Sequence, residues 1–65
     1  MKKSFGSFLR ERRIRTGMVI ENFGLAEGAM SRLERGERNP TLRTLMRIAK
    51  VFGIPCWKLL KEFES

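Results

Sequence analysis

Residues 30–55 read MSRLERGERNPTLRTLMRIAKVFGIP, and this is the most strongly patterned stretch of the 65-residue chain. Pro40 restricts the residue before it to an extended backbone, so ERNP is predicted to be a turn. Thr41 then has the side chain of a helix N-cap, and Gly53 is placed to end the same helix. Between them, apolar residues recur at the spacing of one helical face: Leu42, Leu45, Ile48, Ala49 and Phe52. We therefore predict an amphipathic helix that packs these side chains into a core.

Shorter helices are predicted on either side of this one. Upstream, GAMSRLER forms a helical run that ends at Gly36, with Met30 and Leu33 three residues apart on one face. Downstream, Pro55 opens a last helix that runs to about residue 63. Its apolar positions are Leu59, Leu60 and Phe63.

The N-terminal part of the chain predicts two further helices. Ser4 can cap a helix over residues 5–16, and residues 18–23 suit a very short helix that Gly24 would end. The first helix carries Arg10, Arg12, Arg13 and Arg15. These cannot share one helical face, so at least one should turn toward an acid. There is no strand signal, so we predict an all-α fold, a compact bundle of about five short helices in a single domain over residues 1–65.

Positive charge dominates the chain but is distributed unevenly. The net charge is +7, made of +5 in residues 1–15, −2 in residues 16–31, +4 in residues 32–50 and zero in residues 51–65. A sequence pI near 10.9 makes nucleic acid the leading class of partner, because neutralising phosphates releases counterions and drives association.

The composition also excludes several classes of protein. One cysteine and no histidine leave no metal site of the usual kind, residues 1–13 lack the apolar run of a secretory signal, and no apolar run has the length of a membrane span. We expect a cytoplasmic protein. No Asp, His or Tyr is present, so no nucleophile-and-base constellation can be assembled. We expect no enzyme activity, no cofactor, no metal and no membrane partner.

The string from Met30 to Leu60, together with FGSFLRERRIRTG at residues 5–17, resembles the lambda-repressor-like helix-turn-helix family. This family comprises the Cro and xenobiotic-response-element regulators of phages and bacteria. The resemblance implies a bacterial or phage-encoded, nucleoid-associated, repressor-like transcriptional regulator that binds double-stranded DNA sequence-specifically as a homodimer. It also implies a largely buried salt bridge between Arg13 and Glu34.

The resemblance assigns phosphate contacts to the loop and helix start at Arg38, Asn39, Thr41 and Arg43. Physical chemistry favours the same assignment, because a helix N-terminus offers free N–H groups and a partial positive charge beside these arginines. The third helix should enter the major groove and read base edges.

Between Gly17 and Glu34 the chain is shorter than the family pattern by about four residues, one helical turn. If the second helix lost a turn, residues 24–26 form the turn, Leu25 is a core residue and residues 26–29 begin the third helix. If the turn itself lost residues, Gly28 is the turn glycine and Glu27 falls on a buried position, where an unpaired carboxylate would be costly. We favour the first alignment, which gives these candidate base contacts: Glu27, Gly28, Ser31 and Arg32.

The last helix supplies the candidate dimer contacts, Trp57, Leu60 and Phe63. An alternative function also fits the shortened motif: a protein-interaction module, antitoxin-like or a co-regulator, that keeps the helix-turn-helix core but reads operators weakly. Charge alone could also drive non-specific binding to nucleic acid or a membrane surface. Against this, the Lys and Arg residues are dispersed and do not gather on one side.

Overall fold

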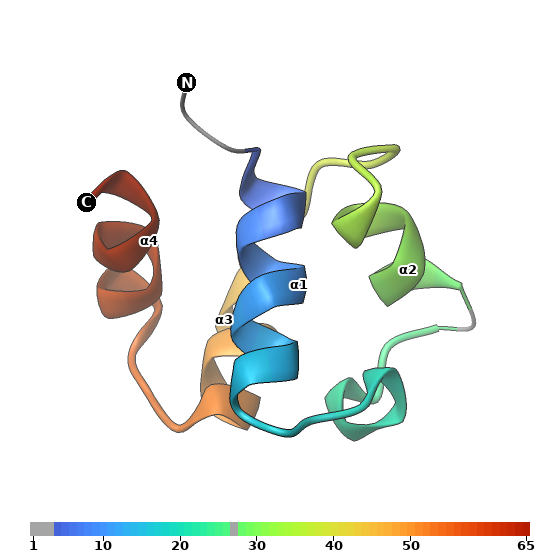
Figure 1. Cartoon of the computed structure of the whole chain (residues 1–65), viewed down its shortest axis with the longest axis horizontal. Helices are drawn as coiled ribbons and strands as arrows, with labels where there is room; N and C mark the ends of the chain where they lie inside the picture. The colour runs from blue at the N-terminus through green and yellow to red at the C-terminus, as the bar shows by residue number, and fades with distance from the viewer. Residues whose placement is uncertain (1–3, 27) are drawn as a thin grey trace.

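The computed structural model describes residues 4–26 and 28–65, and within these ranges the chain is all-helical, as predicted. Figure 1 shows α1 in the middle of the molecule, with α4 on one side of it, α2 on the other and α3 behind it. The described part contains four α-helices and one 3₁₀ helix: α1 (Phe5–Arg15), η1 (Ile20–Phe23), α2 (Ala29–Glu34), α3 (Leu42–Phe52) and α4 (Cys56–Glu64).

Local sequence signals fix most of the helix ends. The Ser4 hydroxyl accepts the Ser7 N–H at 3.2 Å to cap α1, and the Thr41 hydroxyl accepts the Thr44 N–H at 3.2 Å to cap α3. Gly53 ends α3 in the left-handed conformation, which costs a glycine nothing. The predicted short second helix is present as the single 3₁₀ turn η1, which starts two residues later than expected.

The core lies where α1, η1, α2, α3 and α4 meet. Its fully or nearly fully buried apolar side chains are Leu9, Phe23, Met30, Leu33, Ile48, Ala49 and Leu59. Leu42 was predicted to be a core residue, and this prediction is wrong, because Leu42 is 67% exposed. Leu42 is the first residue of α3, at the end of the apolar stripe, where no neighbouring helix covers it.

The helices α1 and α2 approach closely at Gly6, a residue that we did not single out in the sequence. A Cβ at this position would lie 2.7 Å from the Glu34 carbonyl oxygen and closer still to that of Leu33. Only glycine fits without moving the backbone. This contact brings the C-terminal end of α2 against the first turn of α1.

The start of α2 differs from both alignments considered above. Gly28 has φ +77°, so it precedes the helix, and α2 begins at Ala29 instead of Ala26. Gly24 has φ +61° and ends η1, so the second helix does not extend to Gly28 either. Leu25 packs against the core, as the favoured alignment required. The second helix therefore ends at Gly24, and the third begins three residues later than the favoured alignment placed it.

Candidate nucleic-acid interface

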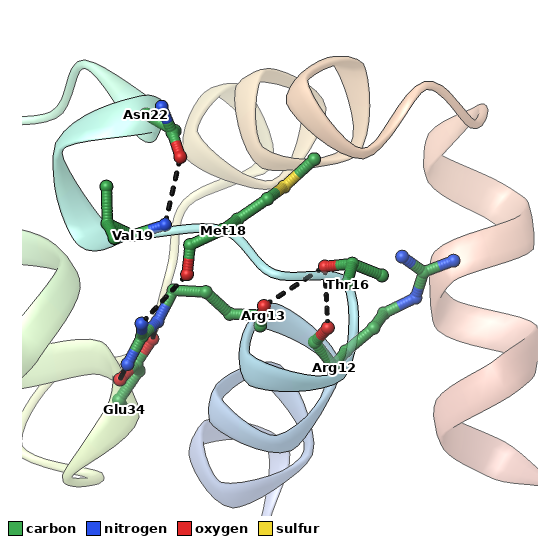
Figure 2. A network of polar contacts seen from close by, with 7 residues as sticks. All are labelled: Arg12, Arg13, Thr16, Met18, Val19, Asn22 and Glu34. Atoms are coloured by element: carbon green, nitrogen blue, oxygen red, sulfur yellow. Dashed lines mark hydrogen bonds and ion pairs between the residues drawn. The ribbon is translucent and has the colours of Figure 1, made fainter.

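A two-armed ion pair joins α1 to α2. Arg13 Nε donates to Glu34 Oε2 at 2.6 Å and Arg13 Nη2 donates to Glu34 Oε1 at 3.0 Å. The side chains are only 13% and 5% exposed, and the hydrogen bonds to Glu34 raise the pKa of Arg13 above its ordinary value. Arg13 Nη1 also donates to the Met18 carbonyl oxygen at 3.2 Å. One guanidinium thus holds both α2 and the turn that leads into η1 (Figure 2).

The neighbouring arginine leaves α1 on the opposite side, as Figure 2 shows. Arg12 donates from Nε and Nη2 to the two carboxylate oxygens of Glu62 on α4, at 3.0 and 3.2 Å. Its guanidinium also lies 4.5 Å from the centre of the Phe52 ring, within the range of a cation–π contact. The expectation that a crowded arginine turns inward thus holds for both Arg12 and Arg13. We did not predict Glu62 as a partner, although it follows the buried Leu59 by three residues on the same helical face.

The Arg12–Glu62 pair predicts a pH dependence of stability. Hydrogen bonds from Arg12 lower the pKa of Glu62 below its ordinary value. The pair therefore stabilises the fold at pH values above the ordinary pKa of 4.5, and this stabilisation is lost as the pH falls through the lowered folded-state pKa. Urea unfolding of the Glu62→Gln variant should depend less on pH below about pH 5 than unfolding of the unchanged protein. Glu64→Gln, on the exposed side of α4, is the matched control, and an equal flattening by both variants would contradict the prediction.

The loop before α3 and the first turn of α3 hold the four predicted phosphate contacts on the surface. Arg38, Asn39, Thr41 and Arg43 are all exposed. Neither Arg38 nor Arg43 forms an ion pair with any residue that the structure describes. The first backbone N–H groups of α3 have no partner within the helix, apart from the one that Thr41 caps. This end of α3 therefore offers free N–H groups between two arginines that no described acid neutralises.

The helix α2 carries two of the four predicted base-contacting residues, Ser31 and Arg32. Arg32 is exposed and its guanidinium folds back toward Gly28, 3.9 Å from where a Cβ of that residue would lie. Ser31 is half-buried, and Gly28 is exposed just before the helix. Glu27, the fourth candidate, lies outside the described residues. Arg35, at the C-cap of α2, forms an ion pair with Glu37 at 2.7 Å, whereas Arg32, within α2, forms no ion pair with a described acid.

A family model described as helix-turn-helix matches residues 21–56, more than half of the chain. The chain belongs to the lambda-repressor/Cro-like helix-turn-helix family. Membership implies binding to DNA. Searches of curated proteins and of solved structures find no match to the chain.

The matched residues 21–56 cover most of η1 and all of α2 and α3, and α3 packs against η1. Arg47 on α3 donates from Nη1 to the Gly24 carbonyl oxygen at 3.0 Å, so α3 holds the C-terminal end of η1. The rings of Phe23 and Phe52 pack edge to face with centroids 5.2 Å apart, which ties the same two elements together. We did not predict the role of Arg47, because the sequence does not show which backbone oxygen its side chain would reach.

The three candidate dimer residues of α4 have different surroundings in this helix-turn-helix domain. Trp57 is 65% exposed and lies beside a shallow open pocket that Lys58, Lys61, Glu62 and Ser65 also line. Leu60 is half-buried. Phe63 packs inside its own chain, edge to face against Phe5 with centroids 5.1 Å apart. The exposed apolar surface of α4 is therefore concentrated at Trp57.

In residues 4–26 and 28–65, no helix is both long and apolar enough to cross a membrane. The same ranges contain no group of three or more Cys, Asp or Glu side chains that could hold a metal ion.

Proposed function

We propose that this single helix-turn-helix domain is a sequence-specific, repressor-like transcriptional regulator that binds double-stranded DNA as a homodimer in the cytoplasm of a bacterium. The observation that carries the proposal is the start of α3. Arg38 and Arg43 flank its capped N-terminus, and neither is paired with a described acid. Such an arrangement binds a phosphate through backbone N–H groups, helix dipole and guanidinium charge together.

Base reading falls to Arg32, with Ser31 in a minor role. An exposed arginine on the helix that enters the major groove can donate two hydrogen bonds to guanine, the commonest specific contact in protein–DNA complexes. The ion pair between Arg13 and Glu34 supports this role indirectly. It holds α2 against α1, so that the side chains of this short helix have a fixed orientation.

Homodimerisation through α4 is supported by the charge distribution. Residues 51–65 carry no net charge in a chain of +7, so two copies can approach through α4 with less repulsion than through the basic blocks. Trp57 supplies the exposed aromatic side chain that the centre of such an interface requires.

The Arg32→Ala substitution tests the assignment of the reading residue. Binding of the unchanged protein and the variant to a selected operator and to its single-base variants gives a preference at each position. We expect Arg32→Ala to lose discrimination at one guanine by about 1–3 kcal/mol, and to keep it elsewhere. Arg35→Ala removes the arginine at the C-cap of α2, which is already bound to Glu37, and serves as the control. An unchanged preference in Arg32→Ala would show that Arg32 does not read bases.

One observation favours the second function, a protein-interaction module with weakened operator reading. The helix α2 has only six residues and starts at Ala29 after a left-handed Gly28, three residues later than the favoured alignment placed it, so it offers few side chains to the bases. A module of this kind would bind a partner protein while showing no preference among duplex sequences. The same preference measurements on the unchanged protein separate the two functions.

A further inference from the structure

Two of the exposed large apolar side chains in the described part of the chain lie on α3. Leu42 is 67% exposed and Met46 is 57% exposed. They are four residues apart, so they lie on the same flank of the helix, about one turn, or 6 Å, from each other along its axis. No other part of the described chain covers these two side chains.

The charges around this flank indicate what kind of molecule contacts its N-terminal end, at Leu42. The helix α3 carries Arg43, Arg47 and Lys50 and no acid. If a second copy packed the same face of its α3 here by two-fold symmetry, these basic side chains would face identical basic side chains of that copy. A surface that offers negative charge and apolar groups in alternation fits better, and the backbone of duplex DNA has this character because phosphates alternate with deoxyribose rings.

The position of Leu42 within α3 places it next to the proposed phosphate contact. It follows the N-cap Thr41 and precedes Arg43, and the Cα–Cβ bond of a helical residue tilts toward the N-terminus. The exposed side chain of Leu42 therefore belongs to the same end of α3 as the free N–H groups that would meet a phosphate. Met46 lies one turn further from that end.

We propose that Leu42 packs against the deoxyribose adjoining the phosphate at the start of α3. This inference rests on the proposed DNA-binding function and adds an apolar term to it. A contact between apolar groups releases no counterions, so its contribution does not depend on salt in the way that the arginine contacts do. It is also independent of base sequence, since every nucleotide carries the same sugar.

The test compares Leu42→Ala with Met46→Ala, its matched control on the same flank. Affinity for a mixed-sequence DNA duplex about two helical turns long is measured from about 50 to about 200 mM salt. We expect Leu42→Ala to weaken binding about three- to tenfold at every salt concentration, with an unchanged slope of log affinity against log salt. Met46→Ala should bind within about twofold of the unchanged protein. Both variants should unfold at the same urea concentration as the unchanged protein, because both residues are exposed.

Three results would overturn the inference. Equal affinity of Leu42→Ala and the unchanged protein would show that Leu42 does not touch DNA. A lowered salt slope in Leu42→Ala would show that it acts through the phosphate contacts. A monomer–dimer equilibrium that shifts in Leu42→Ala without DNA would show that the flank meets a second copy instead. Failure of the DNA-binding function itself looks different, because the unchanged protein would then bind the duplex with no salt dependence or not at all.

Discussion

Glu34→Ala is expected to lower the free energy of unfolding by about 3 kcal/mol, because the nearly buried guanidinium of Arg13 then loses its partner carboxylate. Arg13 and Glu34 form two hydrogen bonds between α1 and α2, and their side chains are 13% and 5% exposed. A domain of this size is stable by only about 3–10 kcal/mol, so the loss is a large part of the total. Urea unfolding followed by circular dichroism measures it.

Two further variants make this prediction specific to the buried pair. Glu37→Ala removes an acid from an exposed pair with Arg35, whose side chains are 53% and 60% exposed, and should leave the unfolding midpoint almost unchanged. Replacing both Arg13 and Glu34 with methionine should recover much of the stability lost in Glu34→Ala, because no unpaired charge then remains buried. If Glu34→Ala unfolds at the same urea concentration as the unchanged protein, the pair does not hold α1 to α2.

Replacing Arg38 and Arg43 together with alanine is expected to weaken DNA binding about 100-fold at about 50 mM salt, through the loss of two charge-assisted contacts. The slope of log affinity against log salt should become shallower by about 2, because each neutralised phosphate contributes about 0.9 to it. Both arginines are exposed and neither is paired with a described acid. The fold should therefore be unaffected. Titration of a labelled duplex across a salt series gives both quantities.

The matched control removes the same amount of charge elsewhere on the surface. Lys50→Ala with Lys61→Ala takes one lysine from the last turn of α3 and one from the last turn of α4. We expect this double variant to bind more weakly than the unchanged protein by only a few-fold, through its lower net charge. Equal losses in the two double variants would mean that net charge drives binding and that the start of α3 has no special role.

The parts of the fold that could be predicted from the sequence are those set by neighbours in the chain. Ser4 and Thr41 cap the helices that follow them through hydroxyl contacts three residues away, and Gly53 ends a helix through its own backbone conformation. The buried Met30 and Leu33 followed from helical spacing. Each of these depends on a few consecutive residues.

The features that we did not predict depend on which elements become neighbours in space. Gly6 matters because α2 lies against it, and Arg47 matters because the Gly24 carbonyl oxygen lies within its reach. Leu42 follows the apolar pattern of α3 but lies beyond the helices that cover the rest of the stripe. The predicted start of α2, at Ala26, was wrong for a local reason. Gly28 has a left-handed backbone, which a helix cannot continue through, so α2 begins after it.

In the candidate site, too, some features could be predicted from neighbouring residues in the chain and others could not. The exposed positions at the start of α3 followed from the turn, the N-cap and the charge of that block. How the side chains of α2 would meet a base could not be predicted, because it depends on where this short helix begins. The structure places that beginning at Ala29, which leaves Arg32 as the leading candidate for base reading.

Selection from a pool of random DNA duplexes with the unchanged protein is the most direct test of the central claim that this helix-turn-helix domain reads sequence. We predict enrichment of an inverted repeat with half-sites about one helical turn apart, with a guanine at one position of each half-site for Arg32. A pool that remains random after several rounds, while affinity falls steeply with salt, would contradict the claim and leave only binding to the phosphate backbone.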